Sequence, residues 1–189
     1  SVQTKTNAGR SFLEKRRDRI DHDAKFRQRV EIDPNFVIFS DFHSPKPMNW
    51  SWEDPASTHR IANYFLKGSE EFKQAELLIK QIPKADSMDL DGSIERWKNQ
   101  FRSDGGGPVR PIISNTFVAG FPTTIVEING EYMGIGASFH KYNYTMLLAL
   151  IEYEKGNIIL RVVGPSETIQ SHRTSWNTFL EQTTHTNED

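Results

Sequence analysis

Residues 141–165 read KYNYTMLLALIEYEKGNIILRVVGP, and this stretch decides the fold class. Two runs rich in aliphatic and aromatic residues, 145–153 and 157–163, flank the polar connection Glu154-Lys155-Gly156. Two such runs joined by a few residues that include glycine are typical of a β-hairpin. The stretch therefore predicts a pair of antiparallel strands.

Further strands are predicted on the N-terminal side of this pair. Residues 124–128 alternate in polarity up to Asn129-Gly130, the strongest short signal for a hairpin turn, so one strand is expected before this dipeptide and another after it. Residues 36–39 and 60–66 are also expected to be strands. Residues 71–82 suit either a helix or a strand. The strands together predict an antiparallel meander.

Two helices are predicted from apolar residues at helical spacing. The first has Asp91 as its N-cap and ends in the glycine-rich loop 105–108. The second follows the strand-ending pair Gly164-Pro165, with Ser166 as its cap. Their apolar faces are Leu90, Ile94, Trp97 and Phe101 in the first, and Ile169, Trp176, Phe179 and Leu180 in the second. The expected fold class is therefore α+β, an antiparallel sheet flanked by helices.

Composition restricts the class of protein. The chain has 189 residues, of which 36% are hydrophobic and 25% charged, which is typical of a globular domain and not of a disordered or membrane-spanning chain. It contains no cysteine, so disulfides, thiolate zinc sites and cysteine nucleophiles are excluded. The net charge of −2 predicts no general attraction to nucleic acid.

Charge is distributed unevenly along the chain. Residues 1–30 carry nine Lys or Arg against four Asp or Glu, a surplus of five positive charges, which leaves −7 for the remainder (−2 minus 5). We expect residues 1–30 to be a basic arm or tether, 31–182 a sandwich domain and 183–189 a frayed polar tail. Residues 10–29 could contact anionic lipid or nucleic acid, but interleaved acidic residues favour a solvated tether or helix, and no specific nucleic-acid partner is expected.

The order of the elements resembles a known fold. A loop with Pro and Trp is followed by a strand, a helix with the sequence Arg96-Trp97-Lys98-Asn99-Gln100, a meander, and a strand ending at Gly164-Pro165 that runs into a helix. This order is similar to the α/β/α sandwich of the PsbP proteins of photosystem II, the Ran-binding Mog1 proteins and the DcrB-type bacterial lipoproteins. Bacterial lipoproteins with an Arg-Trp-x-x-Gln helix resemble it most, although Ser93 stands where they carry Asn.

This resemblance implies both the structure of residues 71–82 and a role for the protein. It favours a strand for residues 71–82, ending at Pro83. It implies a binding or accessory role with a protein partner or a small ligand, without a cofactor, in preference to catalysis. It also implies an extracytoplasmic domain anchored to a membrane through residues 1–30, with a cytoplasmic location as the alternative.

Five residues are candidates for ligand binding. Trp50 and Trp52, in a proline-rich loop, could line an apolar groove or simply fill the end of the sandwich. Arg96 and Gln100 lie four apart on one helix and could hold a carboxylate or phosphate, or alternatively fix the helix to its own sheet. Arg60, at the start of the strand after the loop, is the fifth candidate.

A metal site is the alternative function. Asp41-Phe42-His43 follows the first strand and has the Asp-x-His spacing with which a metallophosphoesterase site begins. The Gly-Asn-His-Asp/Glu segment that such a site also needs does not follow, so a surface loop is the simpler interpretation and no metal is assigned. A metal-dependent hydrolase using Asp41 and His43 is kept as the second hypothesis.

Overall fold

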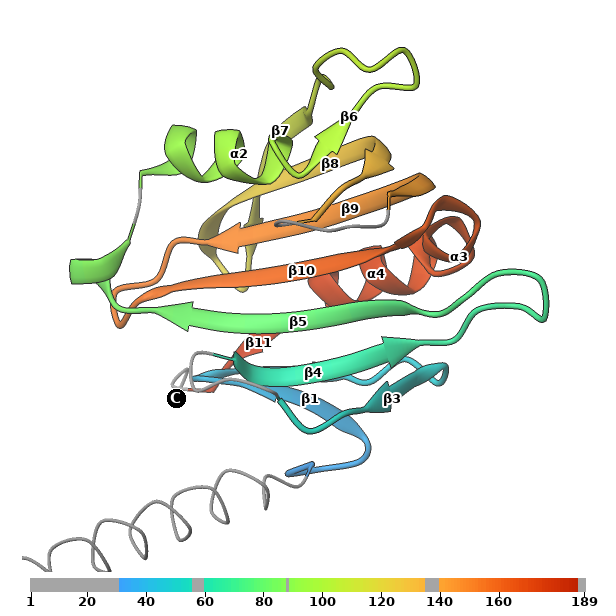
Figure 1. The fold of residues 1–189 in the computed structure, drawn as a ribbon. Coiled ribbons are helices and arrows are strands. Elements are labelled where there is room, and N and C mark those ends of the chain that lie inside the picture. Colours follow the sequence, from blue (N-terminus) through green and yellow to red (C-terminus); the bar gives the residue numbers. More distant parts are fainter. Residues whose placement is uncertain (1–30, 56–59, 88, 135–139, 187–189) are drawn as a thin grey trace, which may run out of the picture. The chain divides into compact units, whose positions relative to one another are not determined.

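An eight-stranded antiparallel sheet organises the protein (Figure 1). The computed structural model describes residues 31–55, 60–87, 89–134 and 140–186. The strand order is β3-β4-β5-β10-β9-β8-β6, and β7 also pairs with β8. The strands are β3 (Trp50–Trp52), β4 (Arg60–Leu66), β5 (Ala75–Ile82), β6 (Phe101–Arg102), β7 (Ile112–Val118), β8 (Phe121–Tyr132), β9 (Lys141–Ile151) and β10 (Asn157–Pro165).

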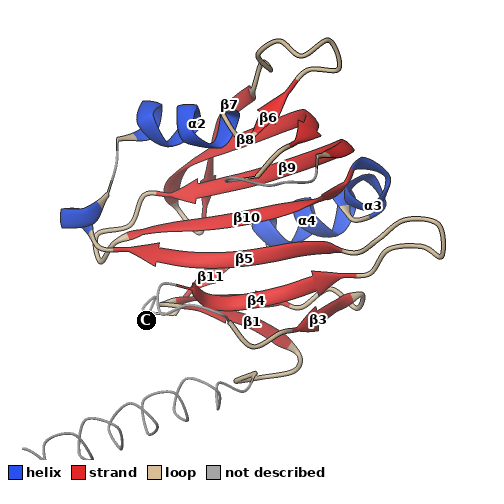
Figure 2. Ribbon diagram, in the orientation of Figure 1, coloured by secondary structure: helices blue, strands red, loops and turns tan. Residues whose placement is uncertain are grey.

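Helices and a second, smaller sheet cover the two faces of the large sheet (Figure 2). On one face lies α2 (Leu90–Lys98), preceded by the short 3-10 helix η1 (Lys84–Asp86). On the other lie α3 (Ser166–Ser171), α4 (Arg173–Glu181) and the three-stranded sheet β1-β2-β11. The strands of this small sheet are β1 (Phe36–Phe39), β2 (Phe42–Pro45) and β11 (Thr184–His185). The predicted α+β class is confirmed.

The sheet separates two hydrophobic cores. Leu160 of β10 pairs with Ala149 of β9 and with Ile79 of β5, and all three side chains are buried in the core beneath α3, α4 and the small sheet. Ile159, the residue before Leu160 in β10, belongs to the core beneath α2, because successive side chains of a strand point to opposite faces. The predicted β9–β10 hairpin is confirmed, and residues 75–82 form a strand that ends at Ile82.

The hairpin expected at Asn129-Gly130 is wrong. Strand β8 runs through this dipeptide. A two-residue hairpin turn lies instead before β8, between β7 and β8, at Ala119 and Gly120, whose φ angles are 50° and 82°. Gly130 has another purpose: its φ is 151°, and a Cβ there would lie 2.5 Å from the carbonyl oxygen of Arg102. The glycine thus permits the close approach of β6 where the β8–β9 register shifts.

The helix termini differ from those expected. The N-cap of α2 is Asp89, not Asp91, and its carboxylate accepts a hydrogen bond of 2.7 Å from the backbone of Gly92. Ser166 is the first residue of α3 and not its cap, and its hydroxyl lies 2.8 Å from that of Thr145. The helix predicted to close the domain is divided into α3 and α4 at His172. The predicted helix is also too long: α2 ends at Lys98, Gln100 follows its C-cap Asn99, and Phe101 lies on β6. The four predicted apolar residues nevertheless contribute to one core.

Two residues of the segment predicted to be a polar tail belong to a strand. Thr184–His185 forms β11, which pairs with β2, and the His185 ring packs 5.1 Å from that of Phe42. The helix expected within residues 10–30 lies outside the described residues. Among the residues that are described, no helix has both the length and the apolar character needed to cross a bilayer.

Candidate anion-binding site

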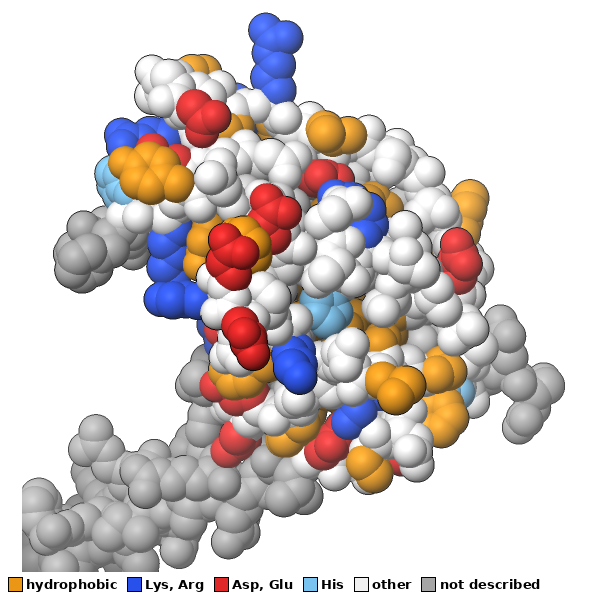
Figure 3. Space-filling model, turned by 90° about the vertical axis from the view of Figure 1, so that its right-hand side faces the viewer, with side chains coloured by type: hydrophobic (Ala, Val, Ile, Leu, Met, Phe, Trp, Pro, Cys, Tyr) orange, Lys and Arg blue, Asp and Glu red, His pale blue; other side chains and the backbone are white. Residues whose placement is uncertain are grey.

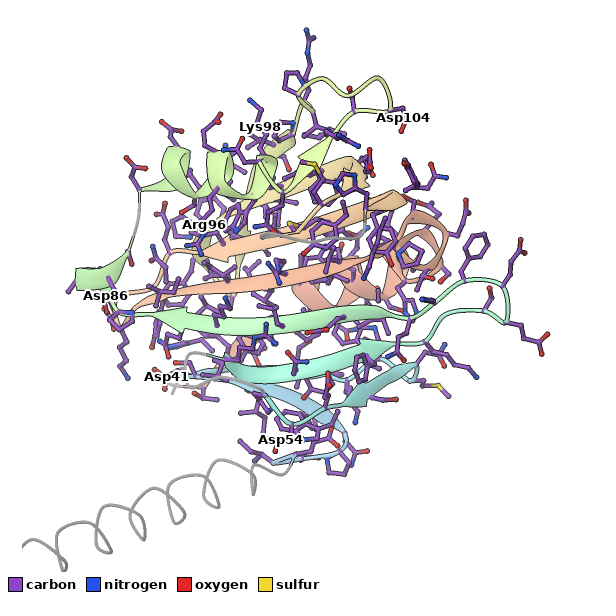
Figure 4. All side chains as sticks on the ribbon, viewed as in Figure 1. Asp41, Asp54, Asp86, Arg96, Lys98 and Asp104 are labelled. Carbon is purple, nitrogen blue, oxygen red and sulfur yellow. The ribbon has the colours of Figure 1, made fainter. Side chains whose placement is uncertain are left out.

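A cavity of about 270 Å³ lies between α2 and the sheet face formed by β4, β5 and β10. Figure 4 shows Arg96 below α2, on the side of the sheet, with Asp86 near the end of β5. Basic side chains reach this cavity from four elements, so we refer to it as the cationic cavity. Its four cations are Arg60 on β4, Lys80 on β5, Arg96 on α2 and Arg161 on β10.

Strand periodicity places the basic side chains on this face. Along β5, Leu78 and Lys80 line the cavity, whereas Leu77 and Ile79 enter the opposite core. Arg60 stands opposite Lys80 in the β4–β5 register. Arg161 stands opposite Leu78 in the β5–β10 register. Three adjacent strands therefore present one cation each to the same space, and α2 adds the fourth.

Basic side chains outnumber carboxylates among the described residues that line the cationic cavity. Among the described lining residues, Asp86 is the only carboxylate, so the lining carries a charge of +3 (four minus one). Outside the lining, Glu76 lies 3.4 Å from Arg60. Burial lowers the pKa of Lys80, and the neighbouring arginines lower it further. A bound anion would relieve this repulsion, because an opposite charge favours the ionised form of each cation.

One arginine has a buried donor without an acceptor. The Nε atom of Arg161 is buried and has no hydrogen-bond partner within the described part of the chain. Burial also lowers the pKa of Arg161. Guanidinium groups bind carboxylate and phosphate oxygens through charge-assisted hydrogen bonds, which are stronger than neutral ones. Because Arg161 lines the cavity, an oxyanion there would lie near its guanidinium group.

Apolar side chains form much of the remaining wall. They come from both layers of the sandwich and face the same space as the cations. They are Leu78, Ile82, Trp97, Leu150 and Ile159. This mixture of cations and apolar walls suits an organic anion with a carbon skeleton better than a hydrated inorganic ion.

The structure brings three of the five predicted ligand-binding residues together. Arg60, Arg96 and Gln100 all line the cationic cavity. Trp50 and Trp52 lie on β3 and contribute to the opposite core, where Trp50 is 2% exposed with its ring 5.0 Å from that of Phe179.

Sequence reasoning missed Lys80 and Arg161. Each is a single basic residue within an apolar strand, Lys80 between Ile79 and Gln81 and Arg161 between Leu160 and Val162. Their sequence signal was a charged residue that interrupts a buried strand. Lys and Arg are rarely buried without a partner, so such a residue indicates a binding site or an ion pair.

Asp41 and His43 take part in separate interactions. The Asp41 carboxylate accepts hydrogen bonds from the Tyr153 hydroxyl and from Lys155, the latter at 2.8 Å. Hydrogen bonds from these two groups lower the pKa of Asp41. His43 instead lies 2.9 Å from the hydroxyl of Thr184. Within the described ranges no three His, Asp or Glu side chains are grouped as metal ligands would be.

The end of the molecule that faces the viewer in Figure 3 has mixed charge. Figure 3 shows the end formed by the β4–β5 connection and α3, where acidic side chains lie among the basic ones. Two of the other basic groups among the described residues are held by carboxylates: Arg102 donates to Glu131 at 2.6 Å, and Arg173 to Glu127 at 2.9 Å. The cationic cavity differs because its cations outnumber the nearby carboxylates.

Comparisons with known proteins give similarities of fold. No protein-family model and no curated protein matches the sequence. Among solved structures, the cyanobacterial PsbP of Synechocystis is 12% identical with a TM-score of 0.49, covering 84% of this chain and 97% of its own. The Ran-binding protein Mog1p of Saccharomyces cerevisiae is 9% identical with a TM-score of 0.46, covering 77% and 90%. LpqN of Mycobacterium tuberculosis, described as involved in cell envelope biogenesis, is 12% identical with a TM-score of 0.47, covering 86% and 95%.

Proposed function

We propose that this protein is a non-catalytic binding domain that holds a small organic anion in the cationic cavity. One observation carries the proposal: four cations from four elements surround a single cavity whose described lining has one carboxylate. Like charges brought together in this way oppose folding, and an anionic ligand would offset that cost. The apolar wall beside them would hold the carbon skeleton of the ligand.

The chemistry of the lining supports binding over catalysis. Arginine stays protonated at neutral pH, so it can hold an anion but cannot act as a general acid or base. Ser87 and Ser93 line the cavity, but none of the described lining residues is a histidine that could activate them. Burial lowers the pKa of Lys80, but no hydrogen bond joins Lys80 to either serine in the described part of the chain, and the Ser87 hydroxyl donates instead to the carbonyl of Pro83 at 3.1 Å.

Calorimetric titration of the full chain at low ionic strength tests the proposal. The probes are succinate, tricarballylate and propyl phosphate, which carry one to three anionic groups on a short carbon chain. Arg96→Gln is expected to weaken binding by about tenfold, because it removes a charge-assisted hydrogen bond. If the wild-type protein binds none of the three probes, the proposal is wrong.

Lys98→Gln provides the matched control. Lys98 lies on the same helix but is not part of the cavity lining, and it pairs with Glu95 at 3.4 Å. Figure 4 shows Lys98 on the side of α2 away from the sheet. The control removes the same charge from the same element, so it is expected to leave affinity unchanged. Equal losses in Arg96→Gln and Lys98→Gln would indicate a general charge effect and no specific site.

The proposal includes the setting of the domain. We infer that it works outside the cytoplasm, held at a membrane by residues 1–30, and that a protein partner responds to the bound anion. The surplus of five positive charges in residues 1–30 supports attraction to an anionic lipid surface. The full chain should therefore sediment with vesicles that contain phosphatidylglycerol at low salt. Neutralising Lys15, Arg16 and Arg17 together should release it, and sedimentation unchanged by this triple substitution would contradict the tether.

A further inference from the structure

Gln100 lines the cationic cavity and carries a hydrogen-bond acceptor without a partner among the described residues. The residue is 4% exposed, and its side-chain Oε1 has no hydrogen-bond partner among the described residues. Leaving a buried amide oxygen unpaired costs about 1–3 kcal/mol. Arg161, whose buried Nε is also unpaired among the described residues, lines the same cavity as Gln100.

The position of Gln100 is fixed by its backbone. Its N–H donates to the carbonyl of Trp97 at 3.1 Å, and its carbonyl accepts from the N–H of Met133 at 2.8 Å. The side chain therefore extends from an anchored point at the C-terminal end of α2. Arg96, one helical turn earlier, contributes its charge to the same cavity.

The two unpaired atoms require opposite partners. Arg161 Nε is a donor, so the oxygen of a carboxylate or phosphate satisfies it. Gln100 Oε1 is an acceptor, and an ionised carboxylate has no hydrogen to offer it. A simple anion would consequently pair with the arginine, and with the amide N–H groups of Gln100, but leave the Gln100 oxygen unpaired. A ligand with both an anionic group and an O–H or N–H group would satisfy both.

We infer that the ligand of the cationic cavity is an organic anion that also donates a hydrogen bond, a hydroxy- or amino-substituted carboxylate or phosphate ester, and that Gln100 selects it. This inference rests on the proposed function, because it concerns the same ligand. Gln100 acts here as a specificity-determining residue, while the arginines and Lys80 supply the attraction for the anion. Buried polar groups left unpaired by an analogue are the strongest source of discrimination between similar ligands.

Matched pairs of probes test the inference in the full chain. Malate differs from succinate by one hydroxyl group, and glycerol 3-phosphate differs from propyl phosphate by two. Calorimetry is expected to show about tenfold tighter binding of the hydroxylated member of at least one pair. The pair that shows the preference identifies the anion as a carboxylate or as a phosphate.

Gln100→Leu and Gln100→Met give the second arm of the test. Either substitution removes the acceptor and puts an apolar side chain of similar size in its place. Each is expected to reduce malate or glycerol 3-phosphate to the affinity of its unsubstituted partner, with succinate and propyl phosphate unchanged. The wild-type comparison stands by itself if both variants fail to fold.

The outcomes separate the two proposals. Tighter binding of the hydroxylated probes that disappears in the Gln100 variants supports the inference. Equal affinities within each pair overturn the inference and leave anion binding intact. Binding of no probe at all overturns the proposed function, and the inference fails with it.

Discussion

Arg60 on β4 and Lys80 on β5 stand directly opposite each other in the antiparallel sheet. Like charges at paired positions destabilise a sheet, whereas opposite charges at such positions stabilise it. Glu76 lies 3.4 Å from Arg60, but no carboxylate in the described ranges forms an ion pair with Lys80. The ligand-free sheet is therefore strained electrostatically at the point where the proposed anion would bind.

Lys80→Met is expected to stabilise the ligand-free protein while weakening anion binding. Removal of the repulsion with Arg60 should raise the free energy of unfolding by roughly 0.5 kcal/mol at low salt. The gain should shrink at high salt, since salt screens the charges that the substitution removes. Urea denaturation at two ionic strengths measures the gain in stability and its dependence on salt.

Lys67→Met serves as the control for this substitution. Lys67 is exposed, lies between β4 and β5, and is not part of the cavity lining. It should change neither stability nor anion affinity by a measurable amount. A loss of stability in Lys80→Met that exceeds that of Lys67→Met would contradict the electrostatic explanation.

Trp50→Phe is expected to leave anion binding unchanged. Trp50 belongs to the core on the opposite face from the cationic cavity, and its Nε1 atom is buried without a partner among the described residues. Phenylalanine keeps an aromatic contact with Phe179 and removes the unpaired donor, so the net change in stability should stay within about 1.5 kcal/mol. Trp50→Ala should cost about 3–5 kcal/mol through cavity formation. Calorimetry and thermal unfolding measure the two quantities, and weaker anion binding by Trp50→Phe would place Trp50 in the site.

Much of the fold could be predicted because its signals are local. The apolar spacing of α2 and the strands β4, β9 and β10 appear in the sequence as short periodic patterns. Asn129-Gly130 misled the prediction because glycine was needed there for a different reason, the close approach of β6 to β8. The α2 cap was misplaced by two residues because Asp89 and Asp91 are both acceptable caps and only backbone geometry distinguishes them.

The candidate site was only partly accessible from sequence. Arg96 and Gln100 could be associated because residues four apart lie on one face of a helix. Lys80 and Arg161 lie beside Arg96 and Gln100 only because β5 pairs with β10, and these two strands are separated by about 80 residues in the chain. No local pattern specifies that register, and residues 71–82 suited a helix equally well before the sheet was known.

Glu131→Gln is expected to reduce stability at neutral pH and to flatten its acid dependence. Hydrogen bonds from Arg102, at 2.6 and 3.0 Å, lower the pKa of Glu131, and His140 lowers it further. Because the pKa of Glu131 is lower in the folded state, its ionised carboxylate stabilises the fold. This stabilisation is fully present above the ordinary value of 4.5 and is lost as the pH falls through the folded-state value. Unfolding free energies from pH 7 down to pH 2 measure the effect.

Glu181→Gln controls for the loss of a carboxylate. Glu181 is an exposed residue at the end of α4. Its substitution removes a carboxylate but keeps the Arg102–Glu131 pair. If the two substitutions change the pH dependence of stability equally, this pair contributes nothing specific to acid stability.

Gly164→Ala is expected to destabilise the protein by about 1–3 kcal/mol through overpacking. A Cβ on Gly164 in β10 would lie 2.5 Å from the Cβ of Ala75 in β5, and both residues are buried. Gly105→Ala is the control, because a Cβ there meets no atom within 4 Å. Ala75→Gly combined with Gly164→Ala should recover part of the loss, since it removes the nearest clashing atom. Urea denaturation of the wild type, Gly164→Ala, Ala75→Gly and the double variant measures the coupling, and additive losses in the double variant would show that the two side chains do not compete for the same space.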